Sequence, residues 1–172
     1  MPAIHRVRQF FWAAGARVHL KRETEIALIC YLPPAAVTLF RTMPSYDRRH
    51  SLDVAWALQQ RGHTESDFLA AALLHDVGKT ARQARRLRLW HRVAVVLIRA
   101  LDPGLLERIG QDRPGAWRQP FYVQRHHAEI GAEMARRAGC SPRTVEMIGR
   151  HEAWGQIDDP VLQALQAADN EN

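Results

Sequence analysis

The stretch Ala70-Ala71-Ala72-Leu73-Leu74-His75-Asp76-Val77-Gly78-Lys79 decides how the rest of the chain is interpreted. Its alanines and leucines predict a helix suited to burial, and Gly78 is expected to end that helix. An imidazole and a carboxylate at the end of a buried helix cost free energy unless a partner satisfies them. A divalent metal ion is one such partner, because neutral His and ionised Asp are good ligands. The alternative is a local helix-ending pair, with His75 at the C-terminus, where positive charge is favoured.

Length and composition indicate one globular domain. The chain has 172 residues, and its 47% hydrophobic content excludes a disordered protein. The net charge of +6 favours an anionic partner, although Lys21 and Lys79 are the only lysines and arginine supplies the rest. Cys30 and Cys140 show neither metal-type spacing nor a disulfide framework, so we expect a cytoplasmic protein. We also expect no signal peptide and no transmembrane segment.

Apolar spacing and turn residues predict an all-α chain. Ser141 before Pro142 is a strong helix start, Thr64 is a second expected N-cap, and Gly62 and Gly139 are expected to end helices. No second strand-like run is present to pair with the β-branched residues near 93–98, so that stretch is also predicted as helix. Helices are predicted over about 4–20, 24–31, 34–43, 47–60, 64–75, 87–100, 120–138 and 142–151, between the turns at 102–104 and 112–115, and from Pro160 through Asp169.

The sequence does not decide what two of its stretches contact. The amphipathic helix predicted over 4–20 favours packing or a homodimer face, with attachment to a membrane surface as the alternative. Arginines crowd residues 82–92, which favours a solvated face over a phosphate- or membrane-facing role.

Six polar residues fall at predicted helix ends or on apolar faces. Helices joined by short turns pack antiparallel, so alternate helix ends can meet at one place. In chain order, these residues are His50, His75, Asp76, His127, His151 and Asp169.

In this pattern the chain resembles the HD-domain superfamily of metal-dependent phosphohydrolases. The resemblance implies an all-α, single-domain helical bundle with a buried metal site. It assigns residues 46–172 to the HD metal-binding domain and residues 1–45 to an N-terminal helical extension. The matching stretches are Arg49–Ala55, Leu74–Lys79, His127–Glu133, Arg150–Glu152 and Ala167–Asp169.

The resemblance also implies a binuclear site. His50, His75, Asp76 and Asp169 match the ligands of a first metal ion. His127 and His151 match the extra histidines of members that hold two ions, with Asp76 bridging them. Ala128 stands where the family often has Pro in a His-Pro-Glu-x-Gly pattern, and that register selects His127 over His126. The expected cofactors are two divalent ions, from among Mn, Fe, Co, Ni and Zn.

The reaction implied is hydrolysis of a nucleotide or another small phosphate ester by a hydroxide held between the two ions. Asp76 and Lys79 are the expected catalytic residues, with Lys79 neutralising charge on the phosphoryl oxygens. Asp53, one helical turn after His50, is expected to orient that imidazole. The expected substrate-binding residues are Lys79, Arg49, Arg82 and His126.

Two other functions remain open. Some proteins with this ligand pattern are di-iron oxygenases that cleave C–C or C–P bonds, and a third alternative is a non-catalytic metal- or nucleotide-binding regulatory module. The Gly-Tyr-Pro stretch of cyclic-dinucleotide phosphodiesterases is missing after His151, which disfavours that substrate. Nucleic-acid binding has weak support, because no basic groove with interleaved aromatic residues is recognisable.

Overall fold

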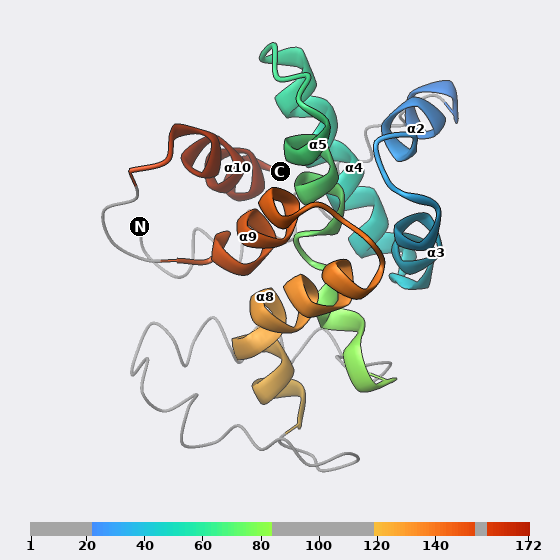
Figure 1. Cartoon of the computed structure of the whole chain (residues 1–172), viewed down its shortest axis with the longest axis vertical. Helices are drawn as coiled ribbons and strands as arrows, with labels where there is room; N and C mark the ends of the chain where they lie inside the picture. The colour runs from blue at the N-terminus through green and yellow to red at the C-terminus, as the bar shows by residue number, and fades with distance from the viewer. Residues whose placement is uncertain (1–21, 84–118, 154–157) are drawn as a thin grey trace.

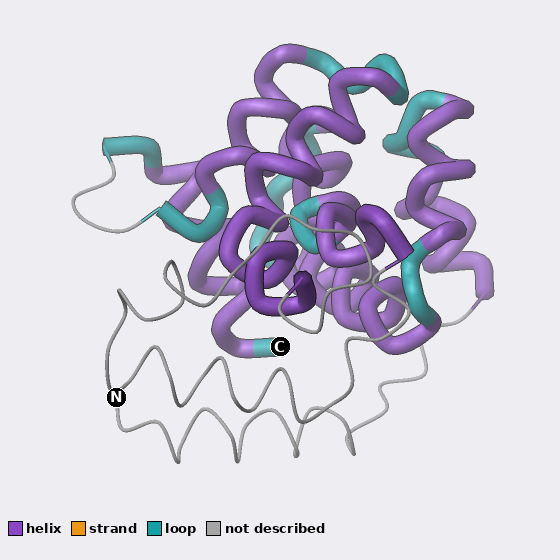
Figure 2. Tube along the Cα trace, turned by 90° about the horizontal axis from the view of Figure 1, so that it is seen from below, coloured by secondary structure: helices purple, strands orange, loops and turns teal. Residues whose placement is uncertain are grey.

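The structure is a computed structural model that describes residues 22–83, 119–153 and 158–172. Helix is the regular structure throughout these residues, and no strand occurs among them, which confirms the predicted all-α class (Figure 2). The elements are α2 (Arg22–Ile29), α3 (Pro34–Thr42), α4 (Ser45–Gln60), α5 (Ser66–Leu74), the 3-10 helix η1 (Val77–Gln83), α8 (Gln119–Arg137), α9 (Pro142–Arg150) and α10 (Pro160–Glu171). The helices predicted over 4–20 and 87–100, and the turns at 102–104 and 112–115, lie outside the described residues.

Several predicted helix ends are confirmed. Ser141 caps α9, and its side chain accepts a hydrogen bond from the Thr144 backbone N–H at 3.0 Å. Asp159 caps α10 in the same way, through the backbone N–H groups of Val161 and Leu162. Gly62 and Gly139 have φ angles of 89° and 80°, the left-handed conformation that suits glycine after a helix.

Two predicted helix ends are wrong. The helix expected to start at a Thr64 cap begins at Ser66, and Glu65 stands at the N-cap without a side-chain cap hydrogen bond. Asp67, in the first turn of α5, accepts a hydrogen bond from the Ser141 hydroxyl at 2.7 Å, which ties the start of α5 to the start of α9. Gly78 does not end α5, because the α-helix stops at Leu74 and Gly78 lies within η1.

Helix α5 is the centre of the core, as its composition predicts. Every residue from Phe68 to Leu74 is buried, and α5 packs against α2, α4 and α9. Leu28, Ala36 and Phe40 of the preceding helices belong to the same core, and α2 and α3 lie on the opposite side of α4 from α10 (Figure 1). The domain boundary predicted at residue 46 stays a prediction. Within the described residues, no helix is long and apolar enough to span a membrane.

The start of η1 lies very close to α8. A Cβ atom added at Gly78 would overlap the carbonyl oxygen of His127 and lie 2.7 Å from the Gly131 backbone nitrogen. Only a residue without a side chain allows this approach. The contact holds the start of η1, which directly follows Asp76, against the part of α8 that carries His127.

Candidate metal centre

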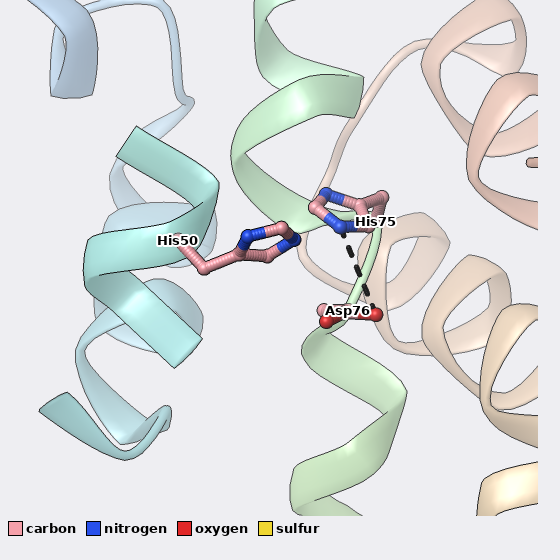
Figure 3. Close-up of side chains that lie close together, drawn as sticks. All are labelled: His50, His75 and Asp76. Carbon is pink, nitrogen blue, oxygen red and sulfur yellow. Dashed lines mark ion pairs between the residues drawn. The ribbon is translucent and has the colours of Figure 1, made fainter. Parts of the chain in front are cut away.

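The six residues predicted to be ligands gather at one place in the bundle. His50 lies on α4, His127 on α8 and Asp169 on α10, while the others stand where α5 and α9 end. His75 and His151 occupy the C-cap positions of these two helices. Figure 3 shows His50 of α4 directed toward His75 and Asp76 at the end of α5.

Three of the histidines are held by the same kind of backbone contact. The Nδ1 atoms of His75, His127 and His151 each lie 2.8 Å from a carbonyl oxygen three residues earlier, on Ala72, Gln124 and Ile148. An Nδ1–H donated to a carbonyl leaves the lone pair on Nε2, as in histidines that ligate metals. The Nε2 atoms of His75 and His127 are buried and make no hydrogen bond of good geometry. A cation at the centre would satisfy both atoms, so the donor set fits a metal ion.

The first half of the centre consists of His50, His75, Asp76 and Asp169. The Asp169 Oδ1 atom lies 2.8 Å from His50 Nε2 and 3.2 Å from His75 Nε2. Asp76 Oδ1 lies 3.7 Å from His75 Nε2, the ion pair drawn in Figure 3. One donor atom from each of His50, His75 and Asp76 falls within 4.8 Å of the others, so the three could hold one ion.

The second half of the centre consists of His127, His151 and the same Asp76 carboxylate. Asp76 Oδ1 lies 3.4 Å from His127 Nε2, and the His127 and His151 ring centroids are 5.1 Å apart. Donor atoms of Asp76, His127 and His151 are again within 4.8 Å of one another. The Asp76 carboxylate therefore lies between two groups of histidines.

The charges of the centre favour a cation. Burial lowers the pKa of His75, but the carboxylates of Asp76 and Asp169 outweigh burial and raise this pKa to about 9. Burial raises the pKa of Asp76, yet Lys79 and His75 hold it well below its usual range. Burial, with His127 and His75 nearby, lowers the pKa of His151 to about 4. In the metal-free protein the carboxylates thus favour a proton on the buried His75 imidazole, and the same field would stabilise a metal ion in place of that proton.

The remaining predicted residues surround this centre to different degrees. Lys79 Nζ lies 2.5 Å from Asp76 Oδ2, so it contacts the shared carboxylate on the side away from the histidines. Arg49 pairs with Asp53 through Nε at 3.1 Å, and the expected role of Asp53 toward His50 stays a prediction. His126 Nδ1 faces Glu129 at 3.0 Å, and its ring lies on Tyr122. Arg82 falls in η1, where its side chain is outside the described residues.

Sequence reasoning assigned no role to Glu152. Its Oε1 atom lies 3.8 Å from His127 Nε2, at the edge of the second half. One signal was present in the sequence, because a glutamate directly after His151 places negative charge at the carboxyl end of a helix, where it is unfavourable.

The all-α bundle with a His/Asp centre corresponds to a known family. Residues 48–171 match the family model described as HD domain, and the chain belongs to that family. HD domains bind divalent metals, and the family consists mostly of metal-dependent hydrolases. No curated protein and no solved structure matched the chain.

Proposed function

We propose that this protein is a metal-dependent phosphohydrolase that acts on a nucleotide or another small phosphate ester. The observation that carries the proposal is the position of Asp76. Its Oδ1 atom stands 3.7 Å from His75 Nε2 and 3.4 Å from His127 Nε2, while its Oδ2 atom meets Lys79 Nζ at 2.5 Å. One carboxylate therefore connects two histidine groups and a lysine.

The histidines and carboxylates would hold two divalent ions. His50, His75 and Asp169 would serve the first ion, His127 and His151 the second, and Asp76 both. When bound, such ions would lower the pKa of a coordinated water molecule to roughly 7 and stabilise charge on phosphoryl oxygens. The backbone carbonyls that accept from the Nδ1 atoms keep His75, His127 and His151 aimed at the centre, so little reorganisation of these rings is needed when an ion binds.

Lys79 would supply positive charge next to the shared carboxylate. Its side chain is 15% exposed and that of Asp76 is 6% exposed, so the pair lies where water screens charge poorly. A substrate phosphoryl group that approaches this edge would meet the ammonium with its non-bridging oxygens. Neutralising those oxygens is the main task of the protein in phosphoryl transfer.

Phosphate release by the reconstituted protein tests the proposal. Purified protein is stripped with a chelator, reloaded separately with Mn²⁺, Co²⁺, Ni²⁺, Zn²⁺ or Fe²⁺, and screened against phosphomonoesters and nucleotides. We expect metal-dependent release of inorganic phosphate or a nucleotide product, abolished by the chelator and by Asp76→Asn. Oxygen consumption by the iron-loaded protein without phosphate release would identify an oxygenase instead. Metal binding with neither activity across the screen would favour the regulatory module.

A further inference from the structure

We propose that Glu152 is a ligand of the second ion, completing the half of the centre that contains Asp76, His127 and His151. The inference deepens the proposed function and rests on its two-ion centre. Glu152 Oε1 lies 3.8 Å from His127 Nε2. Donor atoms that bind one ion lie roughly 3–4 Å apart, because each bond to the ion is about 2.0–2.2 Å long. The Glu152 carboxylate therefore stands at the separation from His127 that two ligands of one ion have.

The surroundings of His127 favour a cation between its Nε2 atom and the Glu152 carboxylate. The His127 side chain is 1% exposed, and its Nε2 atom makes no hydrogen bond of good geometry. Its Nδ1 atom faces the Gln124 carbonyl, so a neutral His127 ring has its lone pair on Nε2. A lone pair and a carboxylate oxygen repel each other at close range. A cation placed between them converts this repulsion into attraction for both groups.

The backbone that carries Glu152 is held on both sides. Gln166 of α10 donates from Nε2 to the His151 carbonyl at 2.9 Å and to the Ala153 carbonyl at 3.1 Å. The Ala153 N–H donates to the Arg150 carbonyl at 2.8 Å, which closes the turn. Helix α10 also carries Asp169. One helix therefore positions the outer carboxylate of each half of the centre.

The two halves become equivalent when Glu152 is included. The first half then has two histidines, the shared Asp76 and its own carboxylate, Asp169. The second half has two histidines, the same Asp76 and Glu152. Neither outer carboxylate is among the mutually closest donor atoms, and the two side chains are similarly exposed, at 32% for Asp169 and 27% for Glu152. A dication in each half would then have a carboxylate of its own in addition to the shared one.

The carboxyl end of α9 is an electrostatically unfavourable place for a glutamate. Glu152 follows α9 by two residues, where the partial negative charge of the helix end disfavours a carboxylate by about 0.3–1 kcal/mol. An ion bound by both His151 and Glu152 would offset this cost.

Metal titration of Glu152→Gln tests the assignment. The matched control is Glu129→Gln, which removes the same charge from a 73% exposed side chain that faces His126. In wild type and Glu129→Gln, we expect Co²⁺ titration calorimetry and elemental analysis to give two ions per chain. In Glu152→Gln, we expect the first ion to bind as in wild type and the second at least about tenfold more weakly. Glu152→Asp, which keeps the charge but withdraws the carboxylate, should also weaken the second ion.

The visible spectrum of bound Co²⁺ separates ligation from a general charge effect, because it reports the ligand set. At saturating Co²⁺, the bands of the second ion should differ between wild type and Glu152→Gln. Identical spectra at saturation, or unchanged affinity for the second ion, would overturn the assignment. A wild-type protein that binds a single ion would overturn it too. Phosphate release is not used as a readout, so a protein that binds two ions through Glu152 but hydrolyses no phosphate ester would refute only the proposed function.

Discussion

Gly78 lies against the backbone of His127, so closely that a Cβ atom at Gly78 would overlap the His127 carbonyl oxygen. The contact joins η1, which directly follows Asp76, to α8, the helix that carries His127. A glycine that looks like a helix terminator in the sequence thus sets the spacing between Asp76 and His127.

Gly78→Ala should therefore damage the second half of the centre more than the first. Helix α8 must move away to accept the methyl group, because the added atom would also lie 2.7 Å from the Gly131 backbone nitrogen. We expect a loss of at least about 2 kcal/mol in the free energy of unfolding, measured by urea denaturation. We also expect the second ion to bind more weakly than in wild type, measured by calorimetry.

Gly149→Ala is the matched control for this change. Its Cβ would meet only the Ala132 Cβ, at an ordinary distance of 3.5 Å. Because alanine favours helix over glycine, the control should be neutral or more stable by up to about 1 kcal/mol. Equal stability of the two variants would contradict the proposed role of Gly78.

Asp76→Asn should remove both ions. The amide keeps the shape of the side chain but lacks the charge that both halves share, so we expect at least about a 100-fold loss of metal affinity. Elemental analysis measures the metal content, and circular dichroism checks that the helices survive. Asp158→Asn removes a charge from an exposed residue before α10 and should retain wild-type metal content. Wild-type metal content in Asp76→Asn would remove Asp76 from the centre.

Lys79→Met should separate catalysis from metal binding. The ammonium contacts Asp76 Oδ2, while the histidines face Oδ1, so its loss leaves the ligand atoms in place. We expect metal content to stay at the wild-type level and kcat to fall about 10²–10³-fold. Lys79→Arg keeps the charge and should recover part of the activity. Unchanged kinetics in Lys79→Met on a phosphate ester that the wild type hydrolyses would exclude Lys79 from the reaction.

Stability of the metal-free protein should fall as the pH rises from about 6.5 to about 9. The folded protein raises the pKa of His75 from 6.5 to about 9, so it binds a proton that the unfolded chain releases in this range. The resulting stabilisation is complete below pH 6.5 and is lost as the pH passes the folded pKa. Each pKa unit corresponds to about 1.4 kcal/mol, which puts the total at roughly 3 kcal/mol.

The metal-loaded protein should show the opposite trend over the same range. An ion at His75 requires the neutral imidazole, so protons compete less as the pH rises and binding adds more stability. Thermal unfolding of chelated and loaded protein at several pH values measures both trends. A metal-free protein whose stability rises between pH 6.5 and 9 would contradict the raised pKa of His75.

Local patterns in the sequence were enough for most of the described helices and for the chemical types of the centre. Ser141 and Asp159 cap helices through backbone groups a few residues away, and Gly62 and Gly139 end helices by their own conformation. Such features depend on neighbours along the chain, so composition and spacing predict them. The His and Asp residues at helix ends were recognisable because unpaired polar groups are rare beside an apolar helix.

Tertiary packing decided what local patterns did not. Asp67 accepts a hydrogen bond from the hydroxyl of Ser141, which is 74 residues away along the chain. Gly78 lies against the backbone of α8, and the Glu152 carboxylate at the end of α9 lies 3.8 Å from His127 of α8. Each relationship joins groups whose separation is set by how helices pack, which the residue order alone does not specify. The sequence by itself determined which side chains are available for binding a cation. Helix packing decided which of them share the Asp76 carboxylate, because distances of a few ångströms between α4, α5, α8, α9 and α10 depend on the whole core.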